Sequence, residues 1–146
     1  MFKHILLATD GSAASEHAAA LAIGLARTHG AKLTALYVVD PYPYLGLGEA
    51  NPMGFQAYMA AAMDHASQAH ARVAALAADG GGKVDVAPRV LEDAGAAAGI
   101  AQTARELNAD LIVVGSHGRT GIARLMLGSV AARVVAESPV PVLVAR

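Results

Sequence analysis

The alternation of short apolar runs with longer helical segments constrains this chain more than any other feature of its sequence. Five apolar runs are predicted as buried strands, namely Ile5–Ala8, Lys32–Val39, Val84–Leu91, Asp110–Val114 and Val140–Ala145. Four intervening segments have apolar residues at helical spacing, namely Ala13–His29, Met53–Asp79, Ala94–Leu107 and Val130–Glu137. Such alternation, without an internal repeat or a linker, is typical of an open, mainly parallel sheet with helices on both faces. The sequence therefore predicts a single α/β domain over residues 1–146.

Composition excludes several classes of protein. The chain has 146 residues, of which 55% are hydrophobic and 16% charged, so a disordered chain is not expected. The formal net charge is −1 and no basic block occurs, which argues against nucleic-acid binding. The absence of cysteine rules out disulfides and thiolate metal sites. No apolar stretch is long enough for a membrane span, and the first apolar run is too short for a signal peptide. We expect a cytoplasmic protein that binds neither nucleic acid nor membrane.

Polar and glycine-rich residues follow two of the predicted strands. The first strand ends in Thr9–Ser12, and the fourth ends in the glycine-rich stretch Gly115–Gly121. In sheets of this kind, ligands bind beyond the carboxyl ends of strands where the winding direction reverses. Asp10 suits a ribose hydroxyl or a metal ion carried by phosphates. The two stretches therefore predict a ligand site at this edge.

A third segment, Gly128–Val130, opens the last predicted helix. The free N–H groups and the dipole of a helix N-terminus favour phosphate. We expect the glycines in this part of the chain to allow close approach of the backbone to a ligand and to adopt positive φ; they are Gly115, Gly118, Gly121 and Gly128.

Plainer interpretations of these residues stay open. Asp10 could serve only as the N-cap of the following helix, and the glycines could form an ordinary loop. Neither a Walker A sequence nor a G-x-G-x-x-G fingerprint after the first strand is present. Ser116 and His117 are neighbours but do not form a G-x-S-x-G motif, and adjacent loop side chains seldom reach each other in a nucleophile–base hydrogen bond. The histidines lack metal-ligand spacing, so we expect no catalytic residue and no metal site of the protein's own.

The spacing Gly115-x-x-Gly118-x9-Gly128-Ser129 resembles the nucleotide-binding signature of the ATP-binding branch of the universal stress protein family. The resemblance extends over essentially the whole chain. It includes three further motifs in the same order, namely Ile5–Ser12, Tyr37–Asp40 and Ser138–Val144, and the segment Ala109–Gly118 around the first glycines.

The resemblance implies a doubly wound five-stranded sheet of order 3-2-1-4-5, which places Asp10 beside Gly115–Gly118. It implies ATP as the ligand, with Mg²⁺ on the phosphates where a metal is present, and with AMP or ADP as alternatives. The adenosine would lie along Ala8, Thr9 and Asp10, with Asp10 at the ribose and the Val38 backbone at the adenine. Gly115, His117 and Gly118 would contact ribose and phosphate, while Gly128, Ser129 and Val130 would bind the phosphate chain. Val114 would also belong to the nucleotide site.

The resemblance also implies a nucleotide-dependent binding or regulatory module in stress adaptation, commonly a dimer. In the implied order the last strand lies at an edge that only Pro139 and Pro141 guard, so we expect a homodimer through Val140–Val144, the alternative being a helix or loop that covers this edge. The alternative is a slow ATPase or an adenylate-transferring enzyme, for which Arg119 and Arg124 are the candidate cations. A two-component receiver domain would need an acidic cluster after the first strand, where only Asp10 occurs. Whether the Asp40–Pro52 loop covers the site, with Tyr42, Tyr44 and Leu45, stays open.

Overall fold

The computed structural model describes residues 1–42, 52–92, 94–117 and 126–146. Its strands are β1 (His4–Ala8), β2 (Lys32–Val38), β3 (Val86–Leu91), β4 (Leu111–Gly115) and β5 (Val142–Ala145). Its helices are α1 (Ala13–His29), α2 (Pro52–Ala78), α3 (Ala96–Glu106) and α4 (Ser129–Glu137). Every element predicted from the sequence is present, and each boundary lies within two residues of its predicted position.

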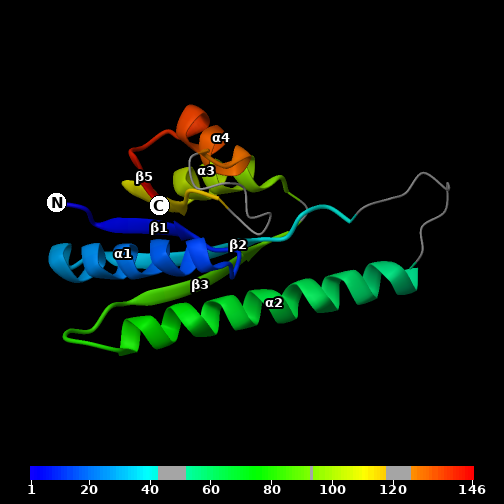
Figure 1. The fold of residues 1–146 in the computed structure, drawn as a ribbon, viewed down its shortest axis with the longest axis horizontal. Coiled ribbons are helices and arrows are strands. Elements are labelled where there is room, and N and C mark those ends of the chain that lie inside the picture. The colour runs from blue at the N-terminus through cyan, green and yellow to red at the C-terminus, as the bar shows by residue number, and fades with distance from the viewer. Residues whose placement is uncertain (43–51, 93, 118–125) are drawn as a thin grey trace.

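All five strands form one parallel sheet of order β3-β2-β1-β4-β5, which confirms the order implied by the resemblance (Figure 1). The central strand β1 pairs with β2 from His4↔Lys32 to Ala8↔Leu36. On its other side β1 pairs with β4 from Ile5↔Leu111 to Leu7↔Val113. The winding direction therefore reverses between β1 and β4, and the carboxyl ends of these two strands lie side by side.

Helices cover both faces of the sheet, as predicted. In Figure 1, α1 and α2 lie on one side and α3 and α4 on the other. Successive side chains of a strand point to opposite faces, so Ile5 and Leu7 pack in the core with α1, whereas Leu6 packs with α3 and α4. All three side chains are fully buried. The two cores fix β1 between the helical layers.

The ends of the helices on the α1–α2 face are tied to defined partners. Ser12 caps α1, its side chain accepting the Ser15 N–H, and Gly30 ends the helix with φ 63°. Arg27 of α1 donates to the carbonyls of Ala77 (2.8 Å) and Asp79 (2.7 Å), at the carboxyl end of α2. Figure 1 shows that the first turns of α2 extend beyond the carboxyl ends of the strands. That part of α2 can therefore form a side wall for anything bound at the sheet edge.

The two edge strands contain or follow prolines. Pro88 lies within β3, and edge strands tolerate proline because one of their sides has no ladder to complete. At the other edge, β5 begins at Val142 rather than at the predicted Val140, and the Pro141 carbonyl accepts the Ile112 N–H at 3.0 Å. Among the described helices, none has the length and apolar character needed to cross a membrane.

Candidate functional site

A cavity of about 590 Å³ lies at the carboxyl edge of the sheet, bounded by the ends of β1, β2 and β4, by α2 and by the start of α4. Its volume is within the range of roughly 300–1,000 Å³ that is usual for small-molecule sites. Every site residue predicted from the sequence lines this cavity except Gly118, which lies outside the described residues. These lining residues are Ala8, Thr9, Asp10, Val38, Val114, Gly115, His117, Gly128, Ser129 and Val130.

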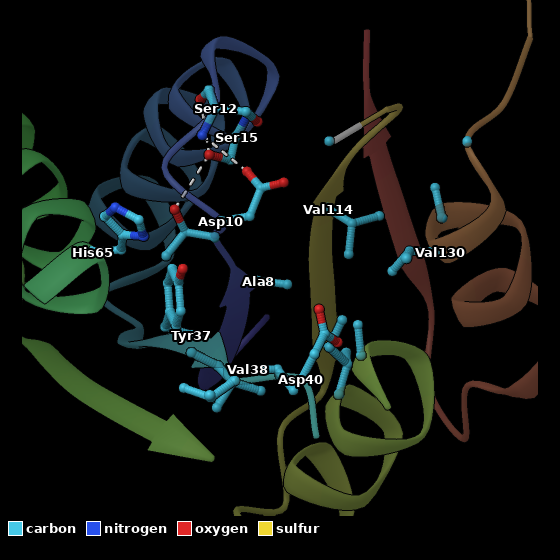
Figure 2. A pocket seen from close by; sticks show the side chains of 18 of the residues that line it. Ala8, Asp10, Ser12, Ser15, Tyr37, Val38, Asp40, His65, Val114 and Val130 are labelled. Atoms are coloured by element: carbon cyan, nitrogen blue, oxygen red, sulfur yellow. Dashed lines mark hydrogen bonds between the residues drawn. The ribbon is translucent and has the colours of Figure 1, made fainter. Parts of the chain in front are cut away.

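Asp10 lies in the turn between β1 and α1. Its Oδ1 accepts the Ser12 N–H at 2.9 Å, which fixes the turn, while Ser12 itself is the N-cap of α1. The plainer interpretation in which Asp10 is the N-cap is therefore wrong, because its side chain bonds two residues ahead of itself and before the helix begins. Figure 2 shows Asp10 and Ser12 on one side of the cavity, with Val114 and Val130 on the other.

Thr9 lines the cavity, but its hydroxyl belongs to a buried chain of hydrogen bonds. Thr9 Oγ1 donates to Ser15 Oγ at 3.3 Å, and Ser15 Oγ donates to the Ser12 carbonyl at 2.9 Å. Both side chains are buried, and the Thr9 N–H donates to the Leu36 carbonyl at 2.9 Å. Thr9 therefore holds the turn that carries Asp10.

From α2, a further side chain holds this turn. Arg72 donates to the Gly11 carbonyl at 2.8 Å and lies 3.7 Å from the Glu16 carboxylate. Gly11 has φ 79°, a conformation that glycine adopts without strain. The position of Asp10 thus depends on contacts with both α1 and α2.

On the β4 side, the glycines are needed for their small size. A Cβ added to Gly115 would lie 3.1 Å from the backbone carbonyl group of Ala14, and one added to Gly128 would lie 2.9 Å from the Ser116 carbonyl oxygen. The expectation of positive φ is wrong for both residues, and Gly128 has φ −61°. Gly118 and Gly121 lie outside the described residues. Close approach between β4, α1 and the start of α4 leaves little room for a side chain at Gly115 and Gly128.

Ser116 and His117 do reach each other. Ser116 Oγ lies 3.0 Å from His117 Nδ1, so the expectation that these adjacent side chains would not meet is wrong. The Ser116 backbone is held from two sides: its N–H donates to the Ala145 carbonyl at 2.7 Å, and its carbonyl accepts the Gly128 N–H at 2.6 Å. Ser116 is buried and does not line the cavity, whereas His117 does. A ligand in the cavity would therefore meet His117 and not Ser116.

The wall contributed by α2 is the part of the site that the sequence did not predict. Tyr58, Ala61, Ala62 and His65 line the cavity, and Figure 2 shows His65 approaching from α2. The Tyr58 hydroxyl donates to the Asp40 carbonyl at 2.8 Å, which ties α2 to the segment after β2. No sequence signal marks these residues, because α2 is rich in alanine on all sides and its faces look alike.

An aromatic cluster lies at the beginning of the Asp40–Pro52 loop. The Tyr42 ring packs edge-on against Phe55, with centroids 5.6 Å apart, and against Tyr58 at 5.3 Å. Tyr44 and Leu45 lie outside the described residues, as do Arg119 and Arg124. Within the described part of the chain, no group of three metal-binding side chains comes together.

Comparisons with known proteins identify relatives that match the chain over nearly its whole length. The model of the Universal stress protein family matches residues 1–146. A curated universal stress protein of Thermus aquaticus is 39% identical over 147 residues, covering 100% of both chains. The solved structure of the universal stress protein UspA from Lactobacillus plantarum is 27% identical, with a TM-score of 0.78 and 99% and 98% of the two chains covered. A universal stress protein solved in complex with cAMP is also 27% identical, with a TM-score of 0.69 and coverage of 99% and 97%.

Proposed function

The chain belongs to the universal stress protein family, and we propose that it binds an adenine nucleotide, ATP in the first place, in the cavity between β1 and β4. One observation carries the proposal: signature residues from separate parts of the chain line a single cavity at the point where the winding reverses. A relative of 27% identity solved in complex with cAMP supports an adenine nucleotide as the class of ligand.

The cavity offers suitable chemistry at each end. The adenine would lie against the apolar side chains of Val38 and Ile100, and the ribose hydroxyls would donate to the Asp10 carboxylate. The phosphates would lie at the start of α4, where the N-cap Gly128 makes no side-chain hydrogen bond to the first turn. The N–H groups of Ser129 and Val130 have no acceptor within the helix and suit phosphate oxygens. Where Mg²⁺ is present, the phosphates would carry it.

Substitutions at Asp10 test the proposal. We expect Asp10→Ala to weaken ATP binding about tenfold to a hundredfold, because a hydrogen bond to a charged group is worth about 1.5–3 kcal/mol. Asp10→Asn retains an oxygen for the Ser12 N–H but removes the charge, so it separates ribose binding from the turn. Asp64→Ala is the control, since Asp64 is exposed on α2 and bonds to Gln68. Calorimetry that finds unchanged ATP affinity in a folded Asp10→Ala variant would refute the role of Asp10.

We further propose that the protein acts as a nucleotide-dependent binding or regulatory module in the cytoplasm rather than as an enzyme. Fast phosphoryl transfer needs cations positioned on the transferring group. The candidates for that role, Arg119 and Arg124, are supported by their sequence position alone. Release of inorganic phosphate from ATP should therefore stay well below about 1 per second. A faster rate would favour the alternative, an ATPase or adenylate-transferring enzyme.

The edge strand β5 supports a homodimer, which is part of the same proposal. Val142, Leu143 and Val144 are only partly buried in one copy, and β5 has a sheet neighbour on one side, β4. A second β5, antiparallel across a two-fold axis, would pair with the open side. Val142→Asp should give a monomer in sedimentation at micromolar concentration. Since Val142 also packs against the α3–α4 core, circular dichroism must show that the variant is folded. A monomeric wild-type chain would contradict the dimer.

A further inference from the structure

Ser116 lies at the junction of three segments that converge on the cavity. Its backbone joins the end of β5 through the Ala145 carbonyl and the start of α4 through the Gly128 N–H. Its side chain contacts the imidazole of His117, which lines the cavity. The serine is 6% exposed. The serine therefore lies behind the cavity wall, and its hydroxyl contacts the side chain of a residue that forms part of that wall.

The contact determines which nitrogen of His117 carries the proton. Within the described chain, Nδ1 is the one hydrogen-bond partner of the Ser116 hydroxyl. A buried O–H that does not donate is costly, which favours donation from the hydroxyl to Nδ1. In a neutral imidazole one nitrogen accepts and the other donates. With Nδ1 as acceptor, the proton of neutral His117 resides on Nε2.

An Nε2–H group is the form of His117 that suits a phosphate. Phosphate oxygens accept hydrogen bonds, so a ring with its proton on Nδ1 would direct a lone pair at them, whereas the opposite tautomer can donate. The first-turn N–H groups of α4 begin next to Gly128, and a Cβ on Gly128 would lie 3.1 Å from His117 Cα. The backbone of His117 and the start of α4 are thus neighbours at this part of the cavity.

We propose that Ser116 is a positioning residue that holds His117 in the Nε2–H tautomer, ready to donate to a phosphate oxygen of the bound nucleotide. The inference rests on the proposed function insofar as it needs a phosphate in the cavity. It assigns to the serine of the Ser116–His117 pair a role that requires no contact with the ligand.

The tautomer can be measured without any ligand. In ¹⁵N-labelled wild-type protein at alkaline pH, the imidazole nitrogen shifts of His117 should show Nδ1 unprotonated and Nε2 protonated. Ser116→Ala should mix the two tautomers, and Ser116→Thr, which keeps the hydroxyl, should restore the wild-type pattern. Wild-type protein with the proton on Nδ1 would overturn the proposal, and this result requires no variant to fold.

Binding tests the consequence for phosphate. Ser116→Ala should weaken ATP binding about three- to tenfold and leave adenosine binding unchanged, because adenosine has no phosphate. In a His117→Ala background, Ser116→Ala should have no further effect on ATP, since the two residues act through one ring. An additive effect, or an equal loss for adenosine, would overturn the positioning role. A wild-type chain that binds neither ligand would instead refute the proposed function, while the tautomer measurement would still decide the part played by Ser116.

Discussion

Replacing Gly128 with alanine tests whether close packing at the start of α4 shapes the phosphate end of the cavity. Gly128 has φ −61° and ψ 155°, which alanine adopts without strain, so backbone conformation is not the obstacle. The obstacle is space. The added Cβ would lie 2.9 Å from the Ser116 carbonyl oxygen and 3.1 Å from His117 Cα, and both are backbone atoms. Neither can rotate away as the end of a flexible side chain could.

The size of the expected effect follows from these distances. Ordinary van der Waals contact begins near 3.4 Å, so the new methyl group must retreat by about half an ångström. That shift lengthens the 2.6 Å hydrogen bond from Gly128 N–H to Ser116 but does not break it. We expect a loss of about 1–3 kcal/mol in the free energy of unfolding, as for other overpacked sites. Misplacing the groups of a site by about 1 Å can reduce its performance a hundredfold. A shift of about half an ångström at the phosphate end should therefore lower ATP affinity roughly tenfold.

Gly95→Ala is a matched control. Gly95 is the N-cap of α3, with φ −66° and ψ 142°, and a Cβ added there would meet nothing within 4 Å. The two variants share the change in N-cap residue and the stiffening of the unfolded chain. The difference between them therefore isolates the clash. Urea unfolding gives the stability of each variant, and calorimetry gives its ATP affinity.

Two results would refute this reasoning. A folded Gly128→Ala variant with wild-type ATP affinity would show that the start of α4 does not shape the phosphate site. Equal losses of affinity in Gly128→Ala and Gly95→Ala would show that the N-cap change, and not the contact with Ser116, is responsible.

Two further predictions concern stability. Thr103 is fully buried and its hydroxyl lacks a partner in the described chain, so Thr103→Val should raise the free energy of unfolding by about 1 kcal/mol. Thr34→Val is the contrasting variant, because it removes a hydroxyl 2.7 Å from His4 Nε2 and should lower the free energy of unfolding. A lower free energy of unfolding for Thr103→Val in urea would contradict the prediction. Burial lowers the pKa of His4 and His70 below the ordinary value. At acidic pH the unfolded chain therefore binds more protons at these two histidines than the folded chain does. The free energy of unfolding should fall as the pH drops below about 6.5 and through the lowered pKa values. His70→Gln should reduce that fall, and equal pH slopes for variant and wild type would show that His70 does not contribute.

The type and order of the elements could be predicted because local and global signals agree in this chain. Apolar runs of strand length alternate with helical periodicity, and Gly30 ends α1 where a left-handed residue is required. Some observed boundaries differ from the predicted ones by one or two residues, because hydrogen-bonded pairing with a neighbouring strand sets where a strand begins. β3, for example, begins at Val86, its first paired residue. The strand order came from the resemblance alone, because periodicity does not specify which strands are neighbours.

The site was predictable only where a motif marks it. Asp10 and Gly115 could be placed at the sheet edge because they lie at the ends of strands, and Gly128 could be placed because it opens a helix. The contact between Ser116 and His117 could not be predicted, since the Ala145 carbonyl and the Gly128 N–H that fix the turn come from distant parts of the sequence. The α2 wall with His65 was missed for a different reason: which face of a helix borders a cavity depends on its packing, and alanine on every face leaves no pattern to interpret.

The pairing of β1 with β4 has a consequence for how the chain folds. Ile5 can pair with Leu111 only after the ribosome has synthesised the residues between them. At about 5–20 residues per second, the time between the synthesis of β1 and that of β4 is roughly 5–20 s. Until then one side of β1 is an open edge that a chaperone or another nascent chain could pair with. The cavity lies across this late-forming pair of strands, with Asp10 after β1 and Gly115 at the end of β4. A nucleotide that contacts residues of both strands can bind only after β1 and β4 have paired. It would therefore slow unfolding and leave the folding rate unchanged.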